Sequence, residues 1–328
     1  MEYTHIPPLS TKVSRIGLGT WSIGGALWGG TNENEAIDTL LSAFEKGINL
    51  VDTAPGYGNG VSEEIVGKAI KKYGNREKIV LATKCGLNLE KKNVFRDSRK
   101  SFLQKEIENS LRRLQVDVID IYQIHWPDPK TPLEETATFL KELLQQGKIK
   151  AIGVSNFSIE QMVEFQKYAP LHVLQAPFNI FENELADKTL PYCLKQGISI
   201  LGYSSLCRGL LSGKMSKERE FKGDDLRKEM DPKFKEPQFS EYLKVANNLK
   251  VWAEQRKRPL SALAVRWVLD SQLSSALWGA RKPEQLNDMD AALGWNLSPE
   301  DFQEVDQIVK NGLKHPVGPE FMAPPVRS

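Results

Sequence analysis

The chain has few cysteines, no long apolar run and almost no excess of charge. Its three cysteines, Cys85, Cys193 and Cys207, lie far apart, so they form neither an even disulfide set nor the close spacing of a metal site. Such cysteine usage fits a reducing compartment. No stretch approaches the roughly eighteen apolar residues of a membrane helix, and the first residues lack the apolar core of a signal peptide. We therefore expect a soluble cytoplasmic protein without a metal site.

The charge balance argues against two kinds of partner. There are 44 lysines and arginines against 42 aspartates and glutamates, a formal net charge of +2 among 328 residues. Basic residues are not gathered into one long run, so neither nucleic acid nor a membrane surface is an expected partner. Hydrophobic residues at 40% are typical of a globular protein of a size that buries a substantial core.

Strand-like and helical patterns alternate along most of the chain. Eight apolar runs are each followed by a helical pattern, which predicts a parallel sheet, and eight such units predict a closed (β/α)8 barrel. An open dinucleotide-binding sheet would need a Gly-x-Gly-x-x-Gly turn, and GLGTWSIGG at residues 17–25 has the wrong spacing. The predicted strands are 15–19, 50–52, 78–84, 118–125, 149–155, 172–176, 198–203 and 275–278.

The remaining segments are additions to the eight units of this barrel. We expect a single domain over residues 1–328. A helix over 62–73 is predicted to begin with Ser62 as its N-cap. The segment after the seventh strand is too long for a plain connector. The other assignments are a short hairpin (3–6 and 12–15), that long loop (204–240), two late helices (283–293 and 299–310) and a Pro-rich tail (312–328).

Polar residues close most of the predicted strands. In a barrel of this kind the chemistry lies at the C-terminal ends of the strands, so these side chains should converge on one mouth. They include four ionisable or hydrogen-bonding types on consecutive strands, an unusual set for packing alone. The residues are Asp52, Lys84, His125, Ser155, Asn156, Gln175 and Tyr203.

Three of these residues, together with Tyr57 in the loop after the second strand, suggest acid–base chemistry. A carboxylate such as Asp52 is costly to bury without a partner, and Lys84 ends the adjacent strand. Tyr57 lies in the loop above the two, and a nearby ammonium is expected to lower the pKa of its phenol. Such a phenol can give a proton to a developing alkoxide, while His125 donates a hydrogen bond to the same oxygen. The pattern therefore predicts protonation of a carbonyl, with a reductant supplied by a cofactor.

Other residues at the mouth suit a nicotinamide coenzyme, although each taken alone could make an ordinary loop hydrogen bond. Amide and hydroxyl groups on three strand ends can hold a carboxamide, and Tyr203 offers a face for ring stacking. Two further clusters suit phosphate groups, the second because it opens a helix with two cations. These clusters are Ser204, Ser205, Arg208 and Lys214 after strand seven, and Gly279, Ala280, Arg281, Lys282 and Pro283 after strand eight.

Eight motifs together resemble the aldo-keto reductase family over nearly the whole chain. The resemblance is strongest to a bacterial branch that includes general-stress and inositol-operon reductases. The motifs are GLGTW (17–21), NLVDTAPGYGNGVSEEIVGKA (49–69), LATK (81–84), YQIHWPD (122–128), GVSNFS (153–158), YSSLCRGLLSGK (203–214), WGARKPEQL (278–286) and GPEFMAPP (318–325).

This resemblance implies a catalytic tetrad of Asp52, Tyr57, Lys84 and His125, and NADPH bound extended across the barrel mouth. Substrate would face Trp21, Tyr57, His125 and Trp126. Related branches carry Glu-Asn where this chain has Asp288 and Met289, which leaves adenine recognition open. The implied coenzyme contacts are Thr20, Trp21, Asp52, Ser155, Asn156, Gln175, Tyr203, Ser204, Ser205, Leu206, Cys207, Arg208, Lys214, Arg227, Gly279, Ala280, Arg281 (to the 2′-phosphate) and Gln285.

Three functions remain to be weighed. The first is an NADPH-dependent reductase of aldehydes and ketones, a monomer or weak homo-oligomer. The second is a coenzyme-loaded regulatory subunit, since potassium-channel β subunits resemble the same family; the sequence favours the enzyme because it lacks a long N-terminal extension that could act as a partner arm. The third, an isomerase barrel acting on phosphosugars, has no motif in the chain. We also expect Phe321 and Met322 of the tail to lean over the mouth and shape the substrate site.

Overall fold

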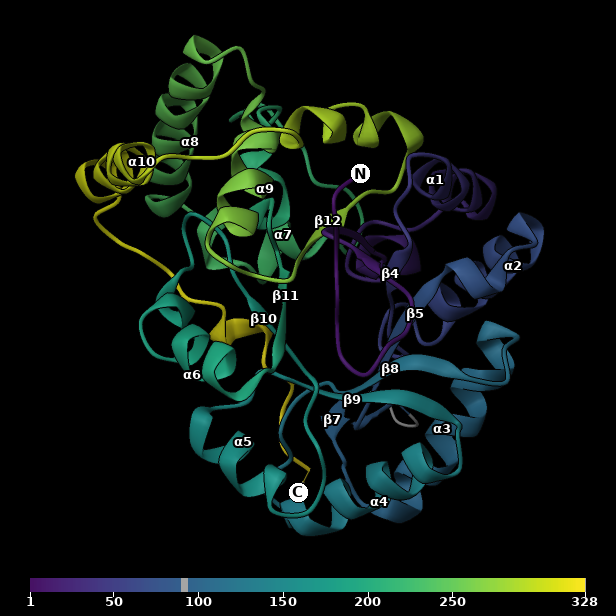
Figure 1. Cartoon of the computed structure of the whole chain (residues 1–328). Coiled ribbons are helices and arrows are strands. Elements are labelled where there is room, and N and C mark those ends of the chain that lie inside the picture. Colours follow the sequence, from purple (N-terminus) through teal and green to yellow (C-terminus); the bar gives the residue numbers. More distant parts are fainter. Residues whose placement is uncertain (90–93, 328) are drawn as a thin grey trace.

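The computed structural model describes residues 1–89 and 94–327, and it confirms the predicted barrel (Figure 1). Eight strands pair in parallel into a closed ring in the order β10-β11-β12-β3-β4-β5-β8-β9. Each strand lies within a few residues of its predicted position. The strands are β3 (Ile16–Gly19), β4 (Leu50–Asp52), β5 (Val80–Cys85), β8 (Ile119–Ile124), β9 (Ile149–Ser155), β10 (Val173–Pro177), β11 (Ser199–Tyr203) and β12 (Ser275–Gly279).

Helices surround this ring. Their apolar faces pack against the outer surface of the strands in one continuous core. The helices that follow the first six strands are α1 (Glu33–Glu45), α2 (Val61–Tyr73), α3 (Lys100–Leu114), α4 (Leu133–Gln145), α5 (Ile159–Gln166) and α6 (Thr189–Gln196). After β11 and β12 come α7 (Leu226–Glu229), α8 (Gln238–Gln255), α9 (Leu260–Asp270) and α10 (Pro299–Gly312).

Alternation along the strands separates this outer core from a second core inside the barrel. Leu50, Val80, Ala82 and Ile121 point inward, whereas Val51 packs outward against the helices. Side chains on a strand alternate with a period of two, so the next inward positions, one step nearer the mouth, belong to polar residues. That alternation places the polar side chains of the mouth directly above the apolar interior core, which we call the apolar plug.

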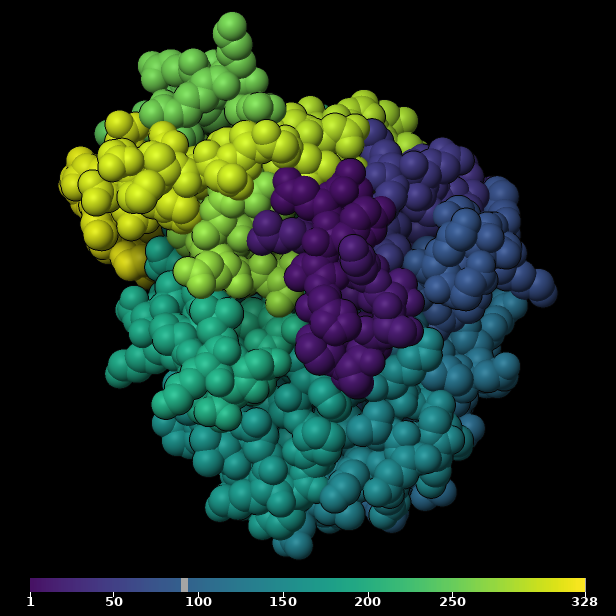
Figure 2. Space-filling view, in the orientation of Figure 1, coloured from purple at the N-terminus to yellow at the C-terminus, as the bar shows by residue number. Residues whose placement is uncertain are grey.

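The N-terminal hairpin closes the other end of the barrel. As predicted, β1 (Tyr3–Thr4) and β2 (Val13–Ser14) pair antiparallel. Apolar side chains of this segment, among them Ile6 and Leu9, join the interior core. Figure 2 shows the N-terminal residues lying across the centre of the visible face. The interior is therefore filled from below and accessible from the mouth.

Two helix predictions from the sequence are wrong in detail. The segment predicted as one helix over 283–293 forms two 3-10 turns, Pro283–Leu286 and Met289–Ala292. Ser62 is not the N-cap of α2, because Gly60 in the left-handed region holds that position and the helix begins at Val61. The hydroxyl of Ser62 is used inside the site, as described below.

The long loop and the tail cover the mouth. The long loop, residues 204–240, folds into short turns and helices, including 3-10 turns over Cys207–Ser212 and Pro232–Phe234. A second small hairpin joins β6 (Leu87–Asn88) and β7 (Phe95–Arg96), and the tail pairs with it through a bridge between Arg96 and Val326. Within the described ranges, no helix has the length and apolar character needed to span a bilayer.

Candidate active site

The centre of the site is a buried ion pair on neighbouring strands. Asp52 ends β4, and Lys84 lies two residues beyond Ala82, its partner in the strand register. Both side chains therefore point into the barrel above the apolar plug. Lys84 Nζ lies 2.7 Å from Asp52 Oδ2, and both residues are at most 2% exposed. The predicted pairing of Asp52 with Lys84 is thus present in the structure.

Tyr57 is brought to this pair by close backbone packing. The turn that carries Tyr57 lies against the backbone of Gly24, and an added Cβ on Gly58 would come within 2.1 Å of the Gly24 carbonyl oxygen. Gly58 also has a φ of 68°. Only glycine meets both requirements without strain, so Gly58 fixes the approach of the turn. Lys84 Nζ then donates a 3.0 Å hydrogen bond to Tyr57 Oη.

The hydrogen bonds of Lys84 determine where the proton of Tyr57 can go. The three donors of the ammonium are used on Asp52 Oδ2, the Thr53 carbonyl oxygen and Tyr57 Oη. Because Lys84 donates to the phenol oxygen, the phenol keeps its own proton to donate elsewhere. Tyr57 lines the cavity at the barrel mouth. Its proton is therefore available to an acceptor in that cavity.

One expectation about Tyr57 is wrong. The sequence predicts that the ammonium of Lys84 lowers the pKa of the phenol. Instead, burial and the negative charge of Asp52 raise the pKa of Tyr57 well above its usual range. Burial also lowers the pKa of Lys84, against the opposing effect of Asp52. Tyr57 is therefore a fully protonated acid at neutral pH.

His125 stands beside Tyr57 as a neutral ring. The two rings meet edge to face with centroids 5.8 Å apart. Burial, and then the charge of Lys84, hold the pKa of His125 well below its usual value. A neutral imidazole carries one N–H and can donate one hydrogen bond into the cavity. This arrangement keeps a donor, and not an acid, next to the phenol.

The sequence reasoning missed Gln123. It lies directly opposite Lys84 in the register of β5 and β8, on the inward face. Its amide nitrogen is 3.4 Å from Asp52 Oδ1, and that of Gln175 is 2.7 Å from the same oxygen. The alternation of β8 was the available signal, since Ile121 two residues earlier also points inward. Two amides therefore share with Lys84 the task of satisfying the buried carboxylate.

A hydroxyl network supports these strand ends from α2. Ser62 Oγ donates to Thr20 Oγ1 at 2.8 Å and accepts from Thr53 Oγ1 at 3.0 Å. Thr20 Oγ1 in turn donates to the Asp52 carbonyl oxygen. The next helix residue, Glu63, accepts from Thr83 on the outer side of β5. The first turn of α2 thus fixes the strands that carry Asp52 and Lys84.

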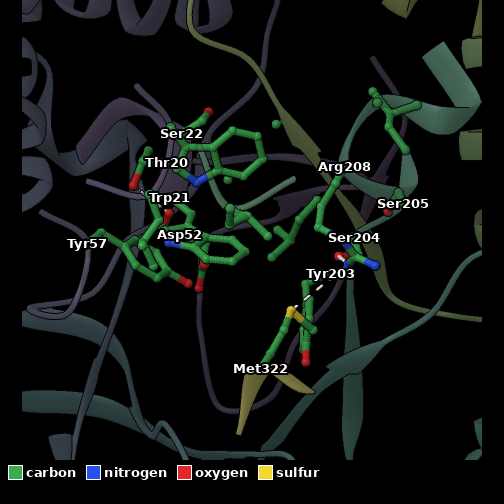
Figure 3. A pocket seen from close by; sticks show the side chains of 18 of the residues that line it. Thr20, Trp21, Ser22, Asp52, Tyr57, Tyr203, Ser204, Ser205, Arg208 and Met322 are labelled. Carbon is green, nitrogen blue, oxygen red and sulfur yellow. Dashed lines mark hydrogen bonds between the residues drawn. The ribbon is translucent and has the colours of Figure 1, made fainter. Parts of the chain in front are cut away.

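A cavity of about 740 Å³ opens above this network. Figure 3 views it with Tyr57 and Asp52 at one side and Tyr203, Ser204 and Arg208 at the other. Most of the predicted site residues line this cavity. Lys84, Cys207 and Ala280 are buried beneath its surface, and Pro283 is not part of its lining. Lining residues that were not predicted are Gly19, Ser22, Leu27, Trp28, Gly56, Leu87, Val94, Gly209, Ser212, Met215, Arg219, Leu226, Met230, Ser261, Leu277, Trp278, Asp288 and, in the tail, Ala323, Pro324 and Pro325. Lys282, Phe321 and Met322, which were expected at the mouth, also line the cavity.

The tail reaches over the cavity between two anchors. Near its start, the Gly318 carbonyl oxygen accepts from Lys233 Nζ at 3.3 Å. Near its end, the backbone N–H of Arg96 donates to the Pro325 carbonyl oxygen at 3.0 Å, and Arg96 Nε donates to that of Pro324. The guanidinium of Arg96 also stacks on Trp126, 5.4 Å from its ring centroid. The tail is therefore part of the cavity wall.

The residues expected to hold the nicotinamide end are bonded to one another in this structure. Tyr203 Oη donates to Asn156 Oδ1 at 2.9 Å, and Asn156 Nδ2 donates to Ser155 Oγ and to the His125 carbonyl oxygen. Gln175 donates to Asp52. A carboxamide bound at this end would exchange with some of these bonds.

Arg208, predicted to lie on the pyrophosphate side, is bonded to carboxylates of the chain itself in this structure. Its Nε lies 2.5 Å from Asp231 Oδ2, and its Nη2 is 3.4 Å from Glu182 Oε1. Glu182 also pairs with Lys233 at 2.7 Å. The guanidinium is thus held in a buried ionic cluster, and only its bond to Ser204 Oγ faces the predicted coenzyme residues. Arg208 anchors the long loop more than it offers free donors.

The charges around the cavity fit a dinucleotide. Six basic side chains among its lining residues, Arg208, Lys214, Arg219, Arg227, Arg281 and Lys282, stand against two carboxylates, Asp52 and Asp288. All six come from the long loop and the loop after β12, away from the Asp52–Tyr57 end. Phosphate groups are favoured where cations gather, and barrels commonly bind phosphate after their last two strands. The residues present thus match an extended nicotinamide dinucleotide.

Comparisons with known proteins agree with this geometry. A model of the Aldo/keto reductase family matches residues 15–310. The aldo-keto reductase YhdN of Bacillus subtilis is 54% identical over 329 residues, 100% of this chain and 99% of that protein. The NADH-specific methylglyoxal reductase of Escherichia coli is 39% identical over 316 residues, 90% of this chain and 95% of that one. The solved glycerol dehydrogenase AKR11B4 from Gluconobacter oxydans is 48% identical, with a TM-score of 0.87 over 98% of this chain and 99% of that chain.

The barrel fold, the family match and these relatives define a carbonyl oxidoreductase that works with a nicotinamide coenzyme. The chain belongs to the aldo/keto reductase family. The family expected from the sequence motifs is therefore confirmed.

Proposed function

We propose that the protein reduces aldehydes and ketones to alcohols with NADPH as the reductant. The observation that carries this proposal is the bond from Lys84 Nζ to Tyr57 Oη, 3.0 Å long, at the floor of a cavity large enough for coenzyme and substrate. It leaves the phenol proton facing the place where a carbonyl oxygen would lie. We also propose the branch with general-stress and inositol-operon reductases, and a cytoplasmic location.

The chain's own residues supply the acid side of the reaction. A bound reduced nicotinamide supplies the hydride. Tyr57 gives the proton of its Oη to the oxygen that gains charge. The Lys84 N–H already directed at Tyr57 Oη stabilises the phenolate that remains. Neutral His125 donates one hydrogen bond that positions the same oxygen.

The test of this assignment is Tyr57→Phe. The variant removes one hydroxyl and keeps the ring that packs beside Trp21 and His125. Loss of a general acid typically costs about 10² to 10⁴ in rate, so turnover of an aromatic aldehyde should fall by that factor. Coenzyme affinity, measured by fluorescence titration, should change little. Turnover within a factor of two of the parent protein would remove Tyr57 from this role.

The same assay addresses the alternative function. A regulatory subunit would bind NADPH tightly and reduce aldehydes only slowly. Steady-state reduction of 4-nitrobenzaldehyde by the purified protein separates the two, because an enzyme turns over repeatedly within seconds and a coenzyme-loaded subunit does not. No specific contact among the described residues favours the subunit.

The choice of NADPH over NADH rests on Arg281. It lines the cavity beside Lys282 and Gln285, and its backbone N–H donates to Gln285 Oε1 at 2.7 Å. A 2′-phosphate brings about two negative charges for such cations. One relative is by name NADH-specific, so this choice needs its own test. Arg281→Ala should weaken NADPH binding about tenfold or more and NADH binding little. Equal loss for both coenzymes would refute the assignment.

The names of two relatives suggest small oxygenated substrates. One is a methylglyoxal reductase, and another is a glycerol dehydrogenase. We propose that this protein accepts short carbonyl compounds as well, beside the aromatic aldehydes that the tryptophans of the cavity favour. A panel that compares methylglyoxal, glyceraldehyde and benzaldehydes would rank these classes.

A further inference from the structure

A glycine-rich loop forms one wall of the cavity. We call residues 25–30 the Trp28 loop. Two internal hydrogen bonds, both to the Gly25 carbonyl oxygen, hold it together. Four of its six residues have positive φ angles: Gly25, Leu27, Gly29 and Gly30. Glycine adopts left-handed backbone conformations readily but loses much conformational freedom when one is fixed, and Leu27 is the one non-glycine residue among the four, so contacts from outside help to fix this shape.

Such contacts come from two other segments. Asp224 of the long loop accepts the backbone N–H groups of Leu27 and Gly29 at 2.8 and 2.9 Å. On the other side, Arg281 donates from Nη1 to the Trp28 carbonyl oxygen at 2.7 Å and from Nη2 to that of Gly30. The long loop thus binds two N–H groups of the Trp28 loop and, through the backbone N–H of Leu226, the Leu27 carbonyl oxygen, while Arg281 binds the carbonyls of Trp28 and Gly30.

Ring contacts connect Trp28 of this loop to Tyr57 through Trp21. The Trp28 ring meets Trp21 edge to face with centroids 5.4 Å apart, and Trp21 stacks on Tyr57 with centroids 6.2 Å apart. The guanidinium of Arg227 stands 5.0 Å from the Trp28 ring centroid. Among the described residues the indole N–H of Trp28 has no hydrogen-bond partner. Packing and the two carbonyl bonds therefore place the ring.

We propose that Arg281 is a positioning residue for the carbonyl substrate, in addition to any contact with the coenzyme. By holding the carbonyls of Trp28 and Gly30 it sets the wall of Trp21 and Trp28 against which the flat apolar part of the substrate packs. The inference rests on the proposed function, since it concerns the same site. It differs from phosphate binding because it uses guanidinium nitrogens that already hold protein oxygens.

The kinetic test uses NADH, because this coenzyme has no 2′-phosphate and the proposed phosphate contact of Arg281 then cannot affect the result. In Arg281→Gln the shorter side chain cannot reach both carbonyls. With saturating NADH, the KM for 4-nitrobenzaldehyde should rise about five- to tenfold while kcat stays within about twofold, since Tyr57 and Lys84 are untouched. The affinity for NADH should stay within about twofold.

A second readout needs no coenzyme and no turnover. Hydrogen exchange of the free protein should show peptides over residues 25–30 exchanging at least about threefold faster in Arg281→Gln than in the parent. Arg76→Gln is the matched control, because Arg76 also donates to two backbone carbonyls, those of Ile79 and Val118, and does not line the cavity. It should change neither the substrate KM nor exchange in the Trp28 loop.

The outcomes separate the two proposals. Unchanged substrate KM with NADH and unchanged exchange, together with weakened NADPH binding, would overturn positioning and keep the coenzyme assignment. A raised KM and faster exchange with no change in NADPH affinity would support positioning and refute the phosphate contact. If the parent protein reduced no carbonyl with either coenzyme, the proposed function and the substrate part of this inference would both fall, and exchange would still decide whether Arg281 holds the loop.

Discussion

The stability losses caused by replacing the two partners of the buried ion pair singly should together exceed the loss caused by replacing both at once. Lys84 Nζ and Asp52 Oδ2 are 2.7 Å apart. At an effective dielectric constant of about 20 their attraction is about 6 kcal/mol, and desolvation of both charges offsets much of it. Lys84→Met leaves a carboxylate held only by two amides, and Asp52→Asn leaves a buried ammonium without a counter-charge. Each change should lower the free energy of unfolding by about 3–5 kcal/mol.

The double variant leaves no unpaired charge. In Asp52→Asn the side-chain oxygen can still accept a hydrogen bond from Gln175 or Gln123 when the amide is oriented toward them. In Lys84→Met the new side chain fills most of the volume of the lysine stem. The loss in the double variant should therefore be smaller than the sum of the single losses by about 3 kcal/mol. The effect lies in the pairing and not in the volume of either side chain.

The assay is a double-mutant cycle of urea unfolding, followed by circular dichroism and by tryptophan fluorescence at one pH and protein concentration. Coincident transitions from both probes are needed before the four free energies are compared. Losses that add to within about 0.5 kcal/mol would show that the two charges do not depend on each other, and the energetic coupling inferred from their contact would be refuted.

Two further predictions concern pH and the tail. Because the pKa of His125 is held well below 6.5 in the folded protein, the unfolded chain binds the extra proton, so stability should fall as the pH drops below about 6.5, by up to about 1.4 kcal/mol per pH unit. His125→Gln should flatten this part of the curve in urea titrations, whereas parallel curves would contradict the reasoning. Deleting the tail from Gly318 should remove the wall made by Phe321 and Met322. The ratio of kcat/KM for bulkier aldehydes to kcat/KM for methylglyoxal should then rise about tenfold. An unchanged ratio would exclude the tail from substrate selection.

Pattern alone predicts the barrel and its central pair. Side chains on a strand point alternately to its two faces, so the inward position of Lys84 and its meeting with Asp52 follow from counting along β4 and β5. The same count places Gln123 of β8 on the inward face. Its role is easily overlooked because a glutamine in a sequence carries no charge that would call for a buried partner. Local periodicity therefore predicts which side chains face the barrel axis.

Other features depend on contacts between distant segments. The pKa of Tyr57 rises because of burial and the negative charge of Asp52, and its burial depends on how distant loops pack, which local sequence does not predict. Serine favours the N-cap position, which is why the sequence predicts Ser62 there, whereas its hydroxyl is used by Thr20 and Thr53. The partners of Arg208 come from the segment between β10 and α6 and from the long loop, more than twenty residues away in each direction. No local rule predicts such a meeting.

The two ends of the chain have unlike surroundings, and this matters for handling the protein. Met1 lies near Gly47 at the closed floor of the barrel, whereas residues 321–325 form part of the cavity wall. An affinity tag, a dye or a linker to a solid support joined after the tail would sit beside the entrance that substrates use. Attachment ahead of Met1 keeps the added group on the opposite face, so kinetic constants measured that way report the enzyme and not its label.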